Sequence, residues 1–176
     1  NRALTRPELA IVLSMSKLAL QDAAEDLRLA EDKIVERELL EAFPKPMRKP
    51  HADAIRAHRL RNEILATRVA NRLVNRLGPS VALDLTEEEG ASLAQVIAAF
   101  LVAERLLDLP KLWREIEDTP LPEMVRVEIF SIAAKSVSNH MSDVLRALGG
   151  QTDVAAMCKL LEPGVRTISA ATAKLI

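Results

Sequence analysis

ADAIRAHRLRNEILATRVANRLVNRLG, residues 52–78, is the stretch that decides the fold of this 176-residue chain. Apolar side chains return along it every three or four residues, the spacing that gathers them on one side of an α-helix. The stretch ends in Gly78, and Pro79 follows, a pair typical of a helix stop. We therefore expect one long helix over residues 52–77.

The expected helix carries apolar and charged side chains on opposite sides. Its apolar side consists of Ala66, Val69, Ala70, Leu73 and Leu77. Its other side carries what we call the arginine stripe: Arg61, Arg68, Arg72 and Arg76. A second, partly apolar stripe consists of Leu60, Ile64, Thr67 and Asn71. Because two sides of the helix are apolar, we expect it to lie at the centre of the fold.

The amide of Asn71 needs hydrogen-bond partners if it is buried, because an unpaired buried polar group costs about 1 to 3 kcal/mol. Asn75 and Arg76 lie about one turn further along the helix, within reach of such a network. We therefore expect these three side chains to interact. With the arginine stripe they form our candidate docking or structural network: Arg61, Arg68, Asn71, Arg72, Asn75 and Arg76.

The local charge of this region favours an acidic partner. Residues 51–78 contain six arginines and two acidic residues, a balance of +4, whereas residues 22–41 contain eight acidic and three basic residues, a balance of −5. The acidic segment can therefore pair with the arginines. A phosphate backbone would also suit them, but only 2% of the residues are aromatic, so stacking partners for single-stranded nucleic acid are scarce. We favour pairing with carboxylates, within the domain or between domains.

The rest of the chain also favours helices. Tyrosine is absent and glycine occurs only five times, so strand-forming and helix-breaking residues are scarce. Thr5-x-x-Glu8 and Ser92-x-x-Gln95 have the spacing of capping boxes. Further helices are expected over residues 6–20, 31–42, 123–148, 153–161 and 165–175, shortly before Gly90, after Ser92 and after Asp108. The expected fold is all-α: a compact bundle of about seven to eight helices without a sheet.

Length favours one domain, because domains commonly contain about 100 to 200 residues. We expect residues 1–176 to form a single helical domain, with a possible subdivision near 119–122 into 1–118 and 121–176. Prolines at positions 44, 46 and 50 predict a linker after the second helix. Because the chain starts at Asn1 rather than Met and ends on an apolar pair, we expect it to be a fragment of a longer polypeptide.

Composition favours a cytoplasmic location. The single cysteine, Cys158, cannot form an internal disulfide, and no signal peptide opens the chain. The apolar run at residues 96–103 is far shorter than the ~20 residues that cross a bilayer. The net charge of −1 gives no attraction to nucleic acid or to a membrane surface. We expect neither as a partner.

Catalytic, cofactor-binding and metal-binding residues are expected to be absent. The glycines, at positions 78, 90, 149, 150 and 164, cannot form G-x-G-x-x-G or a P-loop. His51, His58 and His140 lack the spacing of a zinc site. Cys158 has no histidine nearby in sequence and lies among apolar residues, so we interpret it as a small buried side chain.

Four segments are long enough to indicate a family. They are LTRPELAIVLSMSKLAL (residues 4–20), ERELLEAFPKPMR (36–48), the opening stretch (52–78) and EEEGASLAQVIAAFLVAERLLDLPKLWREIE (87–117). In sequence, order and spacing they resemble the C-terminal helical region of the large bacterial NAD-specific glutamate dehydrogenases. The resemblance covers residues 2–118, and from Leu121 onward it rests on the helical pattern alone.

The resemblance implies a much longer parent enzyme, which uses NAD to convert L-glutamate and water to 2-oxoglutarate and ammonia. In that family the catalytic lysine and aspartate and the dinucleotide-binding fold precede this region, and none maps onto a position here. The resemblance therefore implies that residues 1–176 bind no NAD and are inactive alone. Their implied role is structural: docking on the remainder of the parent chain, homo-oligomerisation, or transmission of an effector signal.

A second interpretation is an independent helical interaction module that binds an acidic protein or nucleic acid through the arginine stripe. Salt distinguishes the two interpretations. Affinity for nucleic acid falls steeply between about 50 and 200 mM salt, because binding releases counterions. A surface that docks only on protein binds neither DNA nor RNA at any salt concentration.

Overall fold

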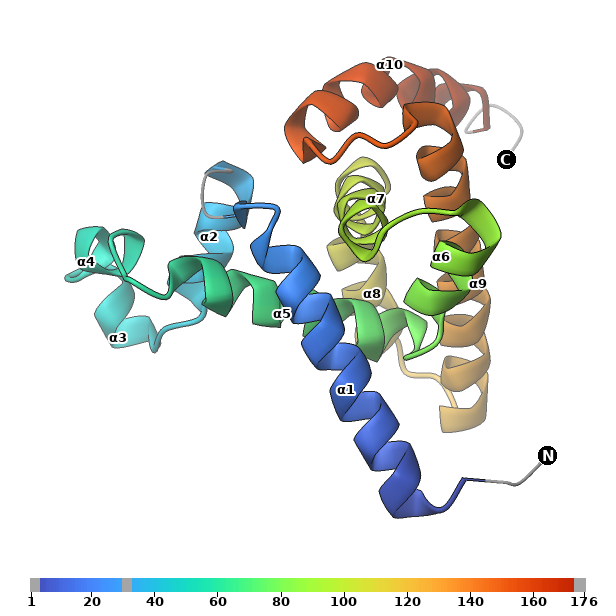
Figure 1. Cartoon of the computed structure of the whole chain (residues 1–176). Helices are drawn as coiled ribbons and strands as arrows, with labels where there is room; N and C mark the ends of the chain where they lie inside the picture. The colour runs from blue at the N-terminus through green and yellow to red at the C-terminus, as the bar shows by residue number, and fades with distance from the viewer. Residues whose placement is uncertain (1–3, 30–32, 173–176) are drawn as a thin grey trace. The chain divides into compact units, whose positions relative to one another are not determined.

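The computed structural model describes residues 4–29 and 33–172. Within these two ranges the regular structure consists of ten α-helices and no strand, which confirms the all-α fold (Figure 1). Internal contacts divide the chain into two units, Asn1–Leu83 and Asp84–Ile176. No helix in the described ranges is long and apolar enough to cross a membrane.

The first unit is organised around α5. Its helices are α1 (Arg6–Glu25), α2 (Lys33–Glu41), α3 (Lys45–Arg48), α4 (Ala52–Arg56) and α5 (Arg61–Leu77). Helix α1 crosses α5 in the antiparallel direction, because Asn62 Nδ2 donates to the Glu25 carbonyl (2.8 Å) and Lys17 Nζ donates to Asn75 Oδ1 (3.2 Å). Helix α2 also packs on α5. The central position expected for this helix is therefore correct.

Only one side of α5 is fully buried. Its buried residues are Leu65, Ala66, Val69, Ala70, Leu73, Val74 and Leu77, which include the whole predicted apolar side. On the second predicted stripe, Leu60 is 55% exposed and Thr67 is exposed, while Ile64 and Asn71 are half-buried. The prediction of a second apolar contact face was therefore wrong at Leu60 and Thr67. The Thr67 hydroxyl instead donates to the Glu63 carbonyl of its own helix (2.8 Å).

The single helix predicted over residues 52–77 was also wrong, because a turn at residues 57–60 separates α4 from α5. The backbone N–H of Leu60 donates to Nδ1 of His58 (3.1 Å) rather than to a helical carbonyl. The imidazole also contacts the ring of Phe43 edge-on, with 5.8 Å between ring centroids. A side-chain acceptor that competes with the helix ladder can end a helix without glycine or proline. The predicted proline linker likewise contains a short helix, α3.

The second unit is organised around α7. It contains most of α6 (Val81–Glu89) and all of α7 (Leu93–Leu106), α8 (Leu109–Asp118), α9 (Glu123–Leu148) and α10 (Val154–Thr172). Helix α7 packs on α8, α9 and α10, and residues 96–104 are all buried. Trp113 of α8 stacks on Phe130 of α9, with 5.8 Å between ring centroids. Since a helix that is apolar all round must be enclosed, residues 96–103 form the core of this unit.

Helix α10 differs from the expected pair of short helices. It runs continuously from Val154 to Thr172 with Pro163 inside it, and residues 173–175 of the expected second helix lie outside the described ranges. Proline removes one backbone hydrogen bond but can kink a helix rather than end it. Two contacts span the site: Arg166 pairs with Glu162 (2.6 Å), and the Thr167 hydroxyl donates to the Pro163 carbonyl (2.9 Å).

The predicted helix ends were more accurate where local signals were strong. Both capping boxes are present, at Thr5 with Glu8 and at Ser92 with Gln95. Helix α9 has the predicted bounds, whereas α1 continues to Glu25, beyond the predicted end at residue 20. Gly78 ends α5 with a φ of 101°, a conformation that other residues rarely adopt.

Candidate functional site

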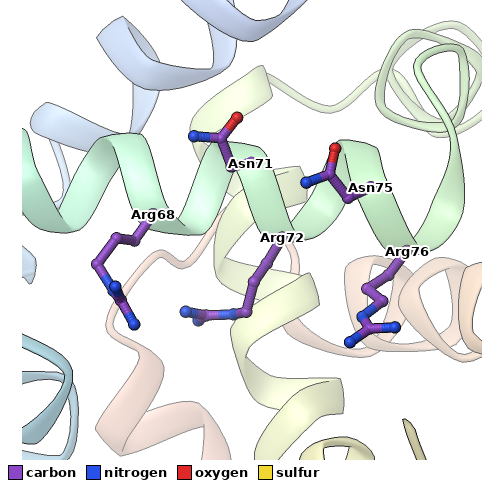
Figure 2. A pocket seen from close by; sticks show the side chains of 5 residues that line it. All are labelled: Arg68, Asn71, Arg72, Asn75 and Arg76. Atoms are coloured by element: carbon purple, nitrogen blue, oxygen red, sulfur yellow. The ribbon is translucent and has the colours of Figure 1, made fainter. Parts of the chain in front are cut away.

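The candidate network lies beside the buried apolar side of α5. Arg68, Arg72 and Arg76 are half-buried next to Leu65, Val69 and Leu73, which face the core. A hollow of about 480 Å³ is lined by Arg68, Asn71, Arg72, Asn75 and Arg76. In Figure 2 the three guanidinium groups extend to one side of the helix and the two amides to the other. The structure thus brings five of the six candidate residues to one hollow.

Arg61, the sixth predicted residue, does not line this hollow. It is the first residue of α5 and is exposed, and its Nη1 lies 3.5 Å from the His58 carbonyl. That distance is at the limit of a hydrogen bond. The structure therefore separates Arg61 from the five residues that we now call the α5 surface: Arg68, Asn71, Arg72, Asn75 and Arg76.

Arg72 pairs with a carboxylate of the first unit. Its Nη1 contacts Oε2 of Glu38, which belongs to α2, within the acidic segment 22–41. Both side chains are about one quarter exposed, at 28% and 25%. This pair is the intramolecular charge pairing that the sequence predicts between the two segments. It orients the Arg72 side chain and neutralises part of the charge of the α5 surface.

Arg68 contributes a buried donor without an acceptor. Its side chain is half-buried, and its Nε is inaccessible to solvent yet makes no hydrogen bond within the described residues. A buried donor left in this state costs about 1 to 3 kcal/mol.

Lys17 adds a further positive charge at the edge of the α5 surface. Its ammonium group donates to Asn75 Oδ1, and this bond fixes the orientation of the Asn75 amide. The α5 surface thus carries three guanidinium groups, of which Arg72 pairs with Glu38, and the Lys17 ammonium lies at its amide side. Guanidinium groups offer planar pairs of donors that match a carboxylate. The arrangement is suited to binding acidic side chains.

The histidines and the cysteine lie apart from this surface. His51 and His140 are exposed, His58 serves the turn before α5, and Cys158 is half-buried in α10 rather than fully buried as expected. The described residues contain no group of three or more His, Cys, Asp or Glu side chains placed to hold a metal ion.

One strong ion pair was missed by the sequence analysis. Arg146 of α9 donates through Nε and Nη2 to the two oxygens of Glu89 in α6, at 2.8 and 2.6 Å, and the Ser142 hydroxyl donates to the same carboxylate at 2.7 Å. The Glu89 side chain is only 8% exposed. The bonds from Arg146 and then Ser142 lower the pKa of Glu89, and the carboxylate in turn raises the pKa of Arg146. No pattern links residues 57 positions apart.

The second unit also has an apolar hollow of about 300 Å³ between α7, α9 and α10. Its walls include Leu107, Val144, Leu161 and Ile168, and its polar members are His140 and Asp143. This hollow could not be predicted from the sequence, because its wall depends on the continuous course of α10 past Pro163.

Comparison with known proteins shows which family the sequence matches. The family model described as "Glutamate dehydrogenase, C-terminal" matches residues 1–176. The NAD-specific glutamate dehydrogenase of Pseudomonas aeruginosa is 35% identical over 118 residues, which are 67% of this chain and 7% of that protein. The protein of the same name from Halomonas elongata is 32% identical over 128 residues, 72% of this chain and 8% of that protein.

A third relative, the NAD-specific glutamate dehydrogenase of Mycobacterium tuberculosis, is 29% identical over 119 residues, which are 68% of this chain and 7% of that protein. No solved structure gives a significant match. The matched region thus spans 7 to 8% of the length of these relatives.

Proposed function

This chain belongs to the glutamate dehydrogenase C-terminal family, and from that membership we propose that residues 1–176 are a non-catalytic helical domain of a large NAD-dependent glutamate dehydrogenase. The parent reaction converts L-glutamate, NAD and water to 2-oxoglutarate, ammonia and NADH. The remainder of the parent polypeptide binds NAD and carries out the chemistry. The lone Cys158 supports a cytoplasmic location.

The role of this domain is to dock on the rest of the parent protein, in the same chain or in another subunit of a homo-oligomer. The observation that carries this role is the α5 surface, where three arginines and two asparagines share one hollow. Glu38 pairs with Arg72, so this surface already binds one carboxylate. Acidic side chains of the catalytic part would bind the guanidinium groups of the surface in the same way.

The parent assignment is tested by measuring NAD-dependent glutamate oxidation in the full-length protein and in a version that ends just before Asn1. Activity in the full-length protein supports the assignment. Loss of activity together with a changed oligomer mass in the truncated version supports a required structural domain. An inactive full-length protein contradicts the parent assignment, and unchanged activity and assembly after truncation contradict the docking role.

The α5 surface is tested by Arg68→Glu in the full-length protein. A carboxylate at this position would repel an acidic partner, so we expect weaker assembly and lower activity. Arg59→Glu is the matched control, because Arg59 is an exposed arginine in the turn before α5 and does not line the hollow. Equal effects of the two substitutions would contradict the role of this surface. Salt-sensitive binding of DNA or RNA by the wild type would favour a nucleic-acid module instead.

A further inference from the structure

The N-terminal half of α1 carries apolar side chains that no part of the first unit covers. None of residues 4–19 is buried. Five large side chains at positions 9–18 of α1 are roughly half exposed or more, and we call them the α1 apolar surface: Leu9 (54%), Ile11 (62%), Val12 (46%), Met15 (60%) and Leu18 (51%). Figure 1 shows the reason, because this half of α1 extends past the point where the helix crosses α5.

The α1 apolar surface covers more than one side of the helix. Ile11, Met15 and Leu18 follow the i, i+4, i+7 spacing and lie opposite the buried Leu20 and Ala24. Leu9 lies on the same side as Leu20 but is 54% exposed, whereas Leu20 is buried. A helix that is apolar on both sides is normally enclosed by protein. The sequence of α1 is therefore that of a buried helix.

The polar side chains at positions 9–18 of α1 are bonded within the unit. The hydroxyls of Ser14 and Ser16 donate to the carbonyls of Ala10 and Val12, each at 2.9 Å. Lys17, the one charged residue among positions 9–18, donates to Asn75. A membrane-surface helix would carry several lysines or arginines on its polar side. The surface instead fits a dry, apolar protein partner.

The length of the relatives indicates which partner this is. The matched region makes up only 7 to 8% of those proteins, and the family describes their C-terminal part. In such a protein the remaining polypeptide belongs to the same chain as α1. A covalently attached partner has a high effective concentration and needs little intrinsic affinity. A segment of the same chain therefore has an advantage over a separate protein.

We propose that the α1 apolar surface binds an apolar segment of the parent polypeptide outside residues 1–176. This inference rests on the proposed function, since it requires a longer parent chain. It concerns a different face from the α5 surface and a different kind of contact, apolar rather than charged. Docking of the domain then has two parts: α1 is enclosed by the preceding polypeptide, and α5 pairs with carboxylates.

The first test uses a photo-crosslinking amino acid at position 15 of the full-length protein, followed by peptide mapping. We expect crosslinks to apolar peptides of the same chain outside residues 1–176, with unchanged mass on a denaturing gel. The control position is 124, because Met124 is also an exposed methionine (86%) but lies on α9. A crosslinked dimer, a crosslink within residues 1–176, or equal yields at positions 15 and 124 would overturn the proposal.

The second test compares hydrogen exchange of α1 amides in full-length wild type, Met15→Glu and Met124→Glu. A covered helix exchanges slowly, so we expect exchange in α1 to become roughly tenfold faster in Met15→Glu and to stay unchanged in Met124→Glu. The proposal is wrong if α1 of the wild type exchanges as fast as α1 of Met15→Glu. Glutamate oxidation is measured separately: an active enzyme with an uncovered α1 refutes only this inference, whereas an inactive enzyme with a covered α1 refutes only the parent reaction.

Discussion

Glu89 shows how a single carboxylate can make the stability of the domain depend on pH. Its pKa lies below the ordinary value of 4.5, first because Arg146 donates to it and then because Ser142 does. A group whose pKa is lower in the folded state stabilises the fold above its unfolded pKa, and this contribution is lost as pH falls through the folded pKa. Loss of the ion pair should therefore weaken the fold only under acidic conditions.

We predict that Glu89→Gln is less stable than wild type at neutral pH and that the difference shrinks as pH falls below the ordinary pKa of 4.5. Thermal unfolding followed by circular dichroism, from about pH 3 to pH 7, checks this. Glu87→Gln is the control, because Glu87 is exposed two residues earlier in the same helix. A difference between Glu89→Gln and wild type that stays constant across the range would contradict the prediction.

A second prediction at this scale concerns the backbone of Gly78. Its φ of 101° is rare for residues with a side chain, yet a Cβ placed there would meet nothing within 4 Å. Gly78→Ala should therefore cost about 1 to 3 kcal/mol through backbone strain alone. Gly164→Ala meets equally open space but lies inside α10 without a positive φ, so it should stabilise by about 0.5 to 1 kcal/mol. Urea unfolding measures both changes: the free energy of unfolding should fall in Gly78→Ala and rise in Gly164→Ala. Changes of the same sign in the two variants would refute the prediction.

Among elements, the two capping boxes have the same chemistry but different surroundings. Ser92 caps α7, whose residues 96–104 are all buried, whereas Thr5 caps the uncovered end of α1. We predict that Ser92→Ala lowers the global free energy of unfolding by about 1 kcal/mol. Thr5→Ala should change it by less than about 0.5 kcal/mol and instead speed local exchange at the start of α1. A global cost for Thr5→Ala equal to that for Ser92→Ala would show that the start of α1 is part of the cooperative core.

Local signals explain which elements could be predicted from the sequence. Caps, glycine stops and apolar periodicity act within a few residues, and they located α7, the end of α5 and the bounds of α9. The break before α5 was missed because it depends on a hydrogen bond to the ring of His58, which also contacts Phe43 of another segment. Periodicity alone cannot reveal a turn that a side chain imposes.

The candidate network also has one part that follows from local sequence and one part that does not. Its five members at the hollow lie on consecutive turns of one helix, so their closeness follows directly from their spacing in the sequence. Arg61 satisfies the same periodicity but lies at the end of the helix, beyond the hollow. The pair of Arg146 with Glu89 and the exposure of α1 could not be predicted, since both depend on which helices pack against each other. Contacts between segments that are distant in sequence leave no local pattern.

For the whole molecule, the open question of domain number can be tested by cooperativity. We predict that residues 1–176 unfold as a single domain, although internal contacts divide the chain at residues 83 and 84. The boundary falls inside α6 (Val81–Glu89), so separate unfolding of the two units would break the hydrogen-bond ladder of a helix. A chain of this length also lies within the range of one domain. Calorimetry should give one peak with an unfolding enthalpy of about 120 kcal/mol, from about 0.7 kcal/mol per residue. The calorimetric and van't Hoff enthalpies should be equal.

Two core variants make this prediction decisive. Leu65 of α5 and Phe100 of α7 are both 0% exposed, each in the core of a different unit. Leu65→Ala should cost about 2 to 5 kcal/mol and Phe100→Ala about 3 to 5 kcal/mol, because each leaves a cavity. If the chain is one cooperative domain, each substitution moves the single peak to lower temperature. Two peaks, of which each substitution moves only one, would show that the two units fold independently and that the domain boundary lies at α6.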